Sequence, residues 1–356
     1  MQPFRTRLSL LAASALAFVL PQFVLPPAAS ADPVSDFYAG KVVTMLVPAS
    51  VGGDVDARAR LISRYMGKYI PGHPTILPRN MPGAVGLQAA NWLYNIAPRD
   101  GTVLHAVMQS MPTHQLLGGQ GVQFDASKFI WIGNTSDESN TIVSWAASGV
   151  KSFADLKDRE VTVGAPGTFT NCVYYPLLMN AVLGTKFKII SGYPGGNEVN
   201  LAMERGEVSA RACQAWSAWA STKPDWLADK KINILVQVRR EASPELPGVP
   251  LLADLASNEE DKMILRFMSM DNSYGRPFAT TPDVPSDRVK ALRQAFDETM
   301  RDPDLLAEAV KSDIKLTPSS GEDVQRLIAE LFATPKSVIE KTKAILAETA
   351  HVARVK

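Results

Sequence analysis

The chain has 356 residues, of which 46% are hydrophobic and 21% are charged, and its formal net charge at pH 7 is +1. This composition is typical of a soluble globular protein, and the length leaves room for two domains. A near-neutral chain without a basic run has no electrostatic footprint for nucleic acid, so we expect no nucleic-acid partner.

The first 31 residues have the pattern of a secretory signal peptide. Arg5 and Arg7 give a positive start, residues 8–20 form a short apolar core, and residues 29–31 are small enough for cleavage. The core is too short for a comfortable membrane span, and no later stretch is long and apolar enough. We therefore expect export, with a retained N-terminal anchor as the alternative.

Cleavage after Ala31 would change both the charge and the redox environment. It would leave 325 residues with a net charge of −1, because the 31 removed residues carry two arginines and no acids. Any site for a small anion must then be positive only locally. An exported protein also meets conditions that permit a disulfide between Cys172 and Cys213, and two free thiols are the alternative.

The mature chain opens with a strand, a glycine turn and a helix. Residues 42–47 are strand formers, the run ends at Pro48, and a helical pattern begins at Asp54 after Gly52 and Gly53. In such a unit the free N–H groups of the helix point at an incoming anion, and the glycines allow close approach. We predict that residues 50–54 bind a small anion, with an ordinary turn as the alternative. Asp54 and Asp56 are expected to cap the helix.

The rest of the chain continues this α/β alternation. The pattern predicts strands at 75–78, 102–108, 129–133, 142–146, 161–163, 187–190, 207–213 and 232–238, and helices near 87–96, 171–183 and 197–205. The chain is expected to leave its first unit near residues 148–151. From about residue 261 the pattern becomes strand-like, and from residue 285 to the end it is helical.

Three glycine-containing loops connect predicted strands to predicted helices, at residues 50–54, 164–170 and 192–196. In open α/β sheets, ligands bind outside the carboxyl ends of the strands. If both units turn those ends toward each other, the three loops line one cleft. Three such loops in an exported protein favour a receptor for a small anion.

Seven motifs, spread in order over almost the whole mature chain, point to one family. They are Phe37-Tyr38-Ala39-Gly40-Lys41, Val47-Pro48 before Gly52-Gly53 and Asp56, Asn80-Met81-Pro82-Gly83-Ala84 with Ala89-Ala90-Asn91, Ala97-Pro98-Arg99-Asp100-Gly101-Thr102, Gly192-Tyr193-Pro194-Gly195, Glu204-Arg205-Gly206-Glu207-Val208 and Pro282-Asp283-Val284-Pro285. With these motifs the chain resembles the substrate-binding proteins of the tripartite tricarboxylate transporter family, the Bug-type receptors.

The resemblance implies an α/β, two-lobed periplasmic binding protein fold, type II-like, with a ligand cleft between the lobes. Residues 32–147 and 265–356 would form the first lobe, and residues 148–264 the second. The implied function is to capture a small organic carboxylate in the periplasm and deliver it to integral membrane permease subunits. We expect a monomer without a cofactor and without enzymatic activity. The alternatives are an exported enzyme on the same fold and a sensor that presents its ligand to a signalling partner.

The candidate ligand-binding residues follow from the three loops and from the ends of neighbouring strands. They are Ser50, Val51, Gly52, Gly53, Asp54, Gln109, Ser110, Pro166, Gly167, Thr168, Phe169, Thr170, Tyr193, Gly195, Gly196, Gln214 and Trp216. The chain departs from the family pattern at Val51, where a proline is usual, and in the loop at 164–170, which lacks the usual histidine. The resemblance therefore implies that these residues bind a carboxylate, but it does not identify the ligand.

Some side chains leave two interpretations open. The Arg211 guanidinium could bind a second carboxylate, although we favour a salt bridge at the lobe surface. Phe169, Tyr174 and Tyr175 could form an apolar ligand wall, although helix core is favoured. Trp219 and Trp226 are expected to pack in the core.

Catalytic and metal signals are weak in this sequence. The four histidines, His73, His105, His114 and His351, show no metal-ligand spacing with each other or with the cysteines. No nucleophile elbow, phosphate-binding loop or dinucleotide fingerprint is present. We therefore expect no metal and no catalytic residue.

Overall fold

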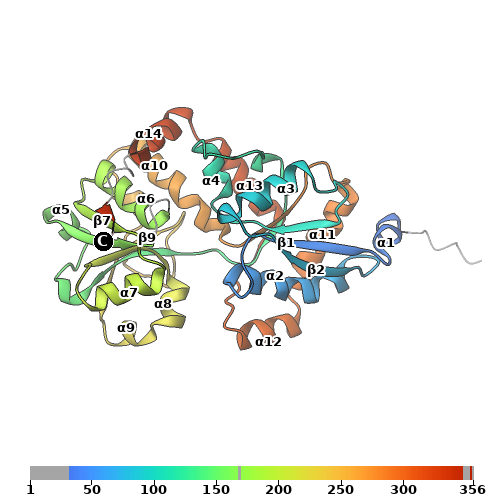
Figure 1. Cartoon of the computed structure of the whole chain (residues 1–356), viewed down its shortest axis with the longest axis horizontal. Coiled ribbons are helices and arrows are strands. Elements are labelled where there is room, and N and C mark those ends of the chain that lie inside the picture. The colour runs from blue at the N-terminus through green and yellow to red at the C-terminus, as the bar shows by residue number, and fades with distance from the viewer. Residues whose placement is uncertain (1–31, 167–169, 348–352, 355–356) are drawn as a thin grey trace, which may run out of the picture. The chain divides into compact units, whose positions relative to one another are not determined.

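The structure is a computed structural model that describes residues 32–166, 170–347 and 353–354 (Figure 1). The predicted signal peptide, three candidate site residues (Gly167, Thr168 and Phe169) and His351 lie outside the described residues. Residues from Pro33 onward form one compact unit. Its backbone is built around two β-sheets.

The first sheet contains the predicted opening strand next to one edge. From one edge to the other its strands are β11 (Ser319–Ser320), β4 (Ile130–Asn134), β10 (Pro277–Thr280), β3 (Val103–Ala106), β1 (Val42–Val47) and β2 (Thr75–Asn80). β1 pairs in parallel with β2 and β3, whereas β10 runs antiparallel to β3 and β4. Val43, Met45 and Leu46 of β1 are fully buried, because side chains on both faces of this strand are covered.

The second sheet has the strand order β12 (Ala353–Arg354), β7 (Phe187–Ser191), β6 (Val161–Ala165), β8 (Ala210–Ala215), β5 (Asn140–Trp145) and β9 (Ile232–Val238). β6 pairs in parallel with β7 and β8, whereas β5 runs antiparallel to β8 and β9. Both sheets are therefore mixed.

Helices follow most strands. They are α1 (Pro33–Tyr38), α2 (Asp54–Tyr65), α3 (Leu87–Asn95), α4 (Met111–Leu116), α5 (Asp155–Asp158), α6 (Asn171–Leu178), α7 (Gly196–Glu204), α8 (Trp216–Thr222), α9 (Pro224–Ala228), α10 (Glu259–Ser269), α11 (Ser286–Thr299), α12 (Pro303–Lys311), α13 (Gly321–Phe332) and α14 (Lys336–Ala347). Two short 3₁₀ segments matter below, η1 (Met66–Tyr69) after α2 and η7 (Met270–Tyr274) after α10. In the part of the chain that the structure describes, no helix combines the length and the apolar character needed to cross a membrane.

The pairing of β5 shows where the chain changes sheets. β5 lies between β8 and β9 in the second sheet, although the predicted first lobe extended to residue 147. Its first five residues are all buried, as expected for a strand at the inside of a sheet. The chain therefore passes from the first sheet to the second between residues 134 and 140, returns between β9 and β10, and joins the second sheet again at β12.

The prediction of strand-like structure from about residue 261 is wrong up to residue 274, because α10 and η7 occupy this part, whereas β10 further on is a strand. The Asn258 side chain accepts a hydrogen bond from the Asp261 N–H at 2.9 Å, which caps the helix. Buried Ile264, Phe267 and Met268 recur at helical spacing. The capping residue and this period outweigh the strand propensity of individual side chains.

Two interpretations about the second sheet are settled by packing. Trp219 and Trp226 are buried, with ring centroids 5.8 Å apart, which confirms the prediction that they pack in the core. Cys172 and Cys213 form a disulfide whose Cα atoms are 4.8 Å apart. The disulfide fastens the first turn of α6 to β8.

Candidate functional site

The loop between β1 and α2 is sterically open. Gly53 is the N-cap residue of α2 with φ −82° and ψ 167°, and no side chain caps the helix. A Cβ built on Gly53 would find its nearest neighbour at 3.9 Å, whereas Gly52 has φ +90°, which favours glycine. Among the described residues, no acceptor is found for the N–H groups of Asp54 and Val55. The helix therefore presents free donors beside empty space.

Asp56 holds this loop in place instead of capping the helix in the predicted way. Its buried carboxylate accepts the Gly52 N–H at 2.9 Å, the Arg60 Nε–H at 2.9 Å and an Asn80 amide hydrogen at 2.8 Å. Burial opposes ionisation, but the hydrogen bonds from Arg60, Gly52 and Asn80 lower the pKa of Asp56 to about 2. Asp56 is therefore ionised at neutral pH.

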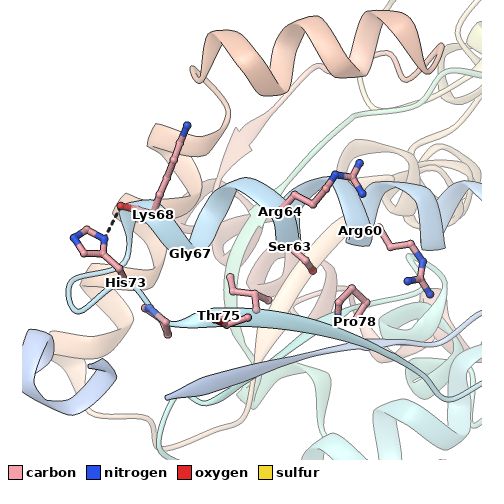
Figure 2. Close-up of a pocket in the computed structure, with 10 residues that line it drawn as sticks. Arg60, Ser63, Arg64, Gly67, Lys68, His73, Thr75 and Pro78 are labelled. Carbon is pink, nitrogen blue, oxygen red and sulfur yellow. Dashed lines mark hydrogen bonds between the residues drawn. The ribbon is translucent and has the colours of Figure 1, made fainter. Parts of the chain in front are cut away.

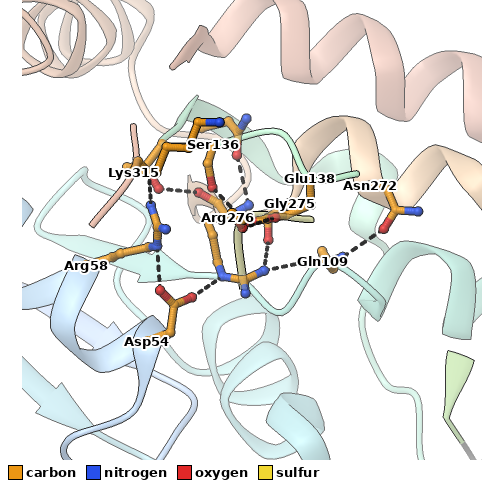
Figure 3. A network of polar contacts seen from close by, with 12 residues as sticks. Asp54, Arg58, Gln109, Ser136, Glu138, Asn272, Gly275, Arg276 and Lys315 are labelled. Atoms are coloured by element: carbon orange, nitrogen blue, oxygen red, sulfur yellow. Dashed lines mark hydrogen bonds and ion pairs between the residues drawn. The ribbon is translucent and has the colours of Figure 1, made fainter. Parts of the chain in front are cut away.

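The prediction that Asp54 caps α2 is also wrong, because its carboxylate faces two arginines. Figure 3 shows Arg58 and Arg276 converging on Asp54. The Arg58 Nε–H donates to Asp54 Oδ1 at 2.8 Å, and the Arg276 Nε–H donates to Oδ2. Burial alone would raise the pKa of Asp54, but the charges of Arg276 and Arg58 outweigh it and lower this pKa. A carboxylate cannot serve as an N-cap while its oxygens bind guanidinium groups.

Arg276 also reaches Gln109, a predicted site residue that follows β3. The Arg276 Nη1–H donates to Gln109 Oε1 at 2.6 Å and to the Gly275 carbonyl at 2.6 Å. Within the described ranges Arg276 Nη2 has no acceptor, and the side chain is 26% exposed. Asp54, Arg58, Gln109 and Arg276, called the Asp54 cluster below, thus combine two positive charges, one negative charge and one free donor group.

The sequence did not reveal Arg276, because it lies 222 residues from Asp54 and belongs to no motif. The topology explains its position. β10 is antiparallel to β3, so the start of β10 lies at the carboxyl end of β3, where the Val107 N–H donates to the Pro277 carbonyl at 2.9 Å. The only signal in the sequence is the short strand after residue 275, and its direction cannot be read from its composition.

A chain of hydrogen bonds continues from the Asp54 cluster to α6. Gln109 Nε2 lies 3.5 Å from Asn272 Oδ1, and Asn272 Nδ2 lies 3.2 Å from the Tyr175 hydroxyl. Asn171 Nδ2 lies 3.2 Å from both the Tyr175 hydroxyl and Asp271 Oδ2. Tyr175 is buried and hydrogen-bonded, in agreement with the favoured core interpretation. These contacts join the first turn of α2, which follows a strand of the first sheet, to the first turn of α6, which follows a strand of the second sheet.

Asp271 is an acid buried without a cation. Its side chain is 2% exposed, and Oδ1 has no hydrogen-bond partner. No ion pair to Asp271 occurs among the described residues. Burial raises its pKa from 3.8 to about 7. The carboxyl group therefore takes up a proton near neutral pH instead of remaining charged.

The candidate residues after β6 and β7 lie at two helix N-termini. Thr170 is the N-cap residue of α6, and Gly195 is the N-cap residue of α7, both with extended backbone. Pro166 is half-buried just after β6, whereas Tyr193 is buried against Val199 and Met203, so its ring belongs to the core. Gly195 and Gly196 therefore remain the accessible candidates of the third loop.

Arg211 does not form the surface salt bridge that we favoured from the sequence. Its side chain lies under α7, and the residue is 7% exposed. The Nη1–H group donates to the Gly196 carbonyl at 3.0 Å and to Asn200 Oδ1 at 2.7 Å. In the described part of the chain it has no carboxylate partner, because it lies inside the lobe and not at its surface.

In the described part of the chain, the side chains of Ser110, Gln214 and Trp216 form no hydrogen bond with the Asp54 cluster. Gln214 is buried in β8, and its carbonyl accepts the Thr141 hydroxyl at 2.9 Å. Ser110 is the N-cap residue of α4, but its side chain makes no capping hydrogen bond. Trp216 lines a cavity of about 280 Å³, next to the segment 136–139 that joins the two sheets.

A second hollow, of about 590 Å³, lies between α2, η1 and the edge strand β2 (Figure 2). Arg60, Arg64 and Lys68 line it, but their charges are paired with Asp56, Glu308 and Asp302, respectively. None of the candidate residues lines this hollow. Because each cation already has a carboxylate partner, this hollow is not the candidate anion site.

The histidines and acids give no metal site in the described ranges, where no three His, Cys, Asp or Glu side chains are grouped to hold an ion. His105 is fully buried in β3, with Nδ1 3.1 Å from the Leu46 carbonyl. Burial lowers its pKa to about 4, so this ring is neutral at pH 7. His105 is part of the core.

Comparison with known proteins gives one sequence relative and a clear fold. No family model matches the chain. It is 28% identical over 344 residues to the "UPF0065 protein in the TAR-I ttuE-ttuC' intergenic region" of Agrobacterium vitis, covering 95% of this chain and 90% of the relative.

Two solved structures establish the architecture. A TctC solute-binding protein from Polaromonas has a TM-score of 0.65 at 18% identity, covering 85% of this chain and 99% of the other. MatC from Rhodopseudomonas palustris, with bound malate, has a TM-score of 0.56 at 18% identity, covering 86% and 99%. The chain thus has the two-lobed α/β fold of periplasmic binding proteins. Both the fold class and the resemblance predicted from the sequence are confirmed.

Proposed function

We propose that this chain, which shares its fold with TctC and MatC, is a periplasmic receptor for a small organic carboxylate. It would deliver this ligand to the membrane subunits of a tripartite tricarboxylate-type transporter. The observation that carries the proposal is the Asp54 cluster, where a free guanidinium donor lies beside the open N-terminus of α2. The malate bound to MatC is itself a carboxylate, which supports this ligand class.

The ligand carboxylate would lie against residues 50–54. The N–H groups of Asp54 and Val55 and the free Nη2 group of Arg276 are its donors, and Gly53 leaves the space for it. Arg58 and Arg276 together exceed the charge of Asp54 by one positive unit, which matches one carboxylate. Each charge-assisted hydrogen bond contributes about 1.5–3 kcal/mol.

The second lobe would close over the ligand with Pro166, Thr170 and the loop at 193–196. In this proposal the lobes follow the two sheets, so the predicted boundary at residue 147 moves to between β4 and β5, and β5 belongs to the second lobe. Exclusion of water by closure strengthens the hydrogen bonds to the ligand. The hydrogen-bonded chain from Gln109 to Asn171 supports such coupling, because it links both lobes beside the site.

The receptor would bind its ligand without changing it and would act as a monomer. The sequence contains no nucleophile elbow, phosphate-binding loop or dinucleotide fingerprint, and the Asp54 cluster has no second carboxylate for acid–base work. A guanidinium and backbone N–H groups bind anions but do not serve as general acids or bases at neutral pH.

A thermal-shift screen of organic acids on the exported protein tests the proposal. An acid present at about 100 times its Kd should stabilise the protein by about 2.7 kcal/mol. Calorimetric titration of each hit should give stoichiometric binding, and the acid recovered from the complex should be unchanged. A screen without any stabilising carboxylate, or recovery of a product, would overturn the proposal.

A further inference from the structure

The cavity beside Trp216 lies where the chain passes from the first sheet to the second. Its volume is about 280 Å³, and it is called the Trp216 cavity below. Segment 136–139, between β4 and β5, forms one side, and residues 216–217 at the start of α8 form another. Residues 243–245 and Lys315 also line it. Pockets for drug-sized ligands have about 300–1,000 Å³, so this cavity suits a small molecule or one group of a larger one.

The lining of the Trp216 cavity carries three acids and two bases. Two ion pairs use four of these charges. Arg239 Nη2 lies 2.9 Å from Asp137 Oδ2, and Lys315 pairs with Glu245. Glu138 is the remaining charged side chain, and among the described residues it has no cationic partner. One negative charge of the lining is therefore uncompensated.

Glu138 is held in place by neutral groups. The residue is only 8% exposed, so its carboxylate has lost most of its contact with water. The Ser217 hydroxyl donates to Oε2 at 3.1 Å, and the Ser136 hydroxyl donates to Oε1 at 3.4 Å. The Glu138 N–H donates to the Asn272 carbonyl at 2.8 Å, which fixes the backbone. Buried charges in proteins are usually paired, so this carboxylate is suited to accept a cation that enters the cavity.

Trp216 supplies an aromatic ring without a cation of its own. Trp219 has Arg211, whose guanidinium carbon lies 5.6 Å from the ring centre. Trp226 has Lys223, whose Nζ lies 4.7 Å from the ring centre. In the described structure no such cation lies over Trp216, which is half-buried and lines the cavity. The face of a tryptophan ring attracts ammonium groups, most strongly where water is excluded. A carboxylate and an aromatic ring, both without a cation, thus line the same cavity.

The Trp216 cavity lies next to the Asp54 cluster. Figure 3 shows Glu138 beside Gly275, and a Cβ on Gly275 would come within 2.7 Å of Glu138 Cγ. The next residue, Arg276, belongs to the Asp54 cluster. The Arg58 Nη1–H of this cluster also donates to the carbonyl of Lys315 at 2.9 Å, and Lys315 lines the cavity. A site with one excess positive charge and a site with one excess negative charge are therefore adjacent.

We propose that the Trp216 cavity binds an alkylammonium group, with Glu138 as its anion and the Trp216 ring as its aromatic contact. This goes beyond the proposed function, because an ammonium group needs no carboxylate to enter the cavity. The group belongs either to a separate organic cation or to the far end of the carboxylate ligand, since the Asp54 cluster is adjacent. Both sources present the same chemistry to Glu138 and Trp216.

The test uses matched molecules in which carbon replaces the ammonium nitrogen. Choline is paired with 3,3-dimethylbutanol, glycine betaine with 3,3-dimethylbutanoate, and 4-aminobutyrate with pentanoate. Calorimetric titration of the exported protein gives the ratio of the two affinities for each pair. We expect at least one ammonium compound to bind about tenfold or more tightly than its carbon counterpart, since a charge-assisted contact has this magnitude. A preference for choline indicates a separate cation, whereas a preference confined to the two acids indicates that one ligand carries both charges.

Glu138→Gln removes the charge but keeps an oxygen that accepts a hydroxyl hydrogen. It should lower the preference toward one, because the ammonium group loses its anion, while the carbon counterpart does not bind more weakly. A merely structural role would weaken both members of a pair alike. Glu160→Gln is the matched control for net charge, because Glu160 is exposed and pairs with Lys188 at 3.4 Å. It should leave every ratio unchanged, and an equal fall in this control would contradict the role of Glu138.

Trp216→Leu keeps the experiment decisive if Glu138→Gln does not fold. Leucine is apolar but has no ring face, so the preference should fall by about threefold or more. Carboxylate binding without preference for any ammonium compound, or a preference that survives in every folded variant, overturns the inference alone. Choline binding with this preference, but without binding of any carboxylate, supports the inference and overturns the proposed function. Absence of binding by every compound overturns both.

Discussion

The N-termini of α2 and α7 are built alike but differ in charge. Each follows a strand and a glycine pair, each has a glycine N-cap without a side-chain cap, and each lies beside a buried arginine. At α2 the protein supplies its own carboxylate, Asp54, between two guanidinium groups. At α7 the carboxylate of Glu198 lies beside the N-cap residue Gly195, but among the described residues it forms no ion pair with Arg211. The backbone provides the same donors at both ends, so the difference lies in the side chains.

The comparison indicates what each end can do for a ligand. A carboxylate already present at α2 fixes Arg58 and Arg276 before any ligand arrives, and only one donor group of Arg276 is left over. The charge at α7 stays uncompensated and must be tolerated by the fold. The N-terminus of α2 is therefore preorganised, whereas the positive charge beside the N-terminus of α7 is not balanced by a bonded carboxylate.

The largest expected effect comes from filling the space at α2. Gly53→Val should weaken carboxylate binding by about a hundredfold or more, because the side chain occupies the place of the ligand oxygen. The backbone at Gly53 lies in the extended region and its Cβ position is free, so the fold should tolerate valine. Calorimetric titration measures the loss, and circular dichroism checks the fold. A folded variant with parental affinity would show that the carboxylate binds elsewhere.

Asp271 extends the comparison to a buried acid without a cation. Its pKa is raised from 3.8 to about 7, so the folded state holds a proton that the unfolded state releases from about pH 4. Stability is therefore lost as the pH rises from about 4 to about 7, and the loss stays constant above that. The loss at pH 8 is about 4 kcal/mol at most.

Asp271→Asn removes this proton linkage. The variant should be more stable than the parent at pH 8, and the gain should shrink as the pH falls toward about 4, below which the parent is protonated in both states. Urea denaturation at the two pH values measures the difference. Asp36→Asn in α1 is the control, because this acid is exposed. A stability gain of Asp271→Asn that does not change with pH would contradict the linkage.

The strand β1, the loop and α2 could be predicted because their signals are local. A run of strand formers, a glycine pair and a helical period lie within 25 residues of one another, and the structure places β1 and α2 as predicted. The function of Asp54 could not be predicted in this way. Its side chain can bind either the helix N–H groups or distant arginines. The sequence around Asp54 gives no sign that Arg276 lies nearby.

Other errors have the same origin in long-range pairing. β5 was assigned to the first lobe by its place in the chain, yet its partners β8 and β9 lie about 70 to 90 residues further on. The prediction of a surface salt bridge for Arg211 was wrong. The burial of Arg211 depends on α7 and Trp219, which pack over β8 only in the folded protein. Local pattern predicts elements, whereas the environment of a charge depends on packing between them.

Arg276 provides the next test of the α2 end. Arg276→Gln should weaken carboxylate binding by about ten- to a hundredfold, since one charge-assisted hydrogen bond contributes about 1.5–3 kcal/mol. Arg64→Gln is the matched control, because Arg64 lies on α2 but pairs with Glu308 outside the Asp54 cluster. Calorimetric titration of both variants decides the matter. Equal losses of affinity in the two variants would mean that the overall charge of the protein, and not the position of Arg276, causes the effect.

The smallest effect is expected for the stability of the α7 end without ligand. Arg211→Met loses two hydrogen bonds to neutral acceptors, each contributing about 1 kcal/mol, but it also removes a buried cation whose desolvation costs several kcal/mol. The variant should therefore unfold in urea with a free energy equal to that of the parent or higher. Arg58→Met is the counterpart, because it breaks the ion pair with Asp54 and the bond to the Lys315 carbonyl at 2.9 Å, and it should lose about 1–2 kcal/mol. A loss at Arg211 as large as that at Arg58 would mean that the protein itself neutralises Arg211, and the contrast between the two ends would disappear.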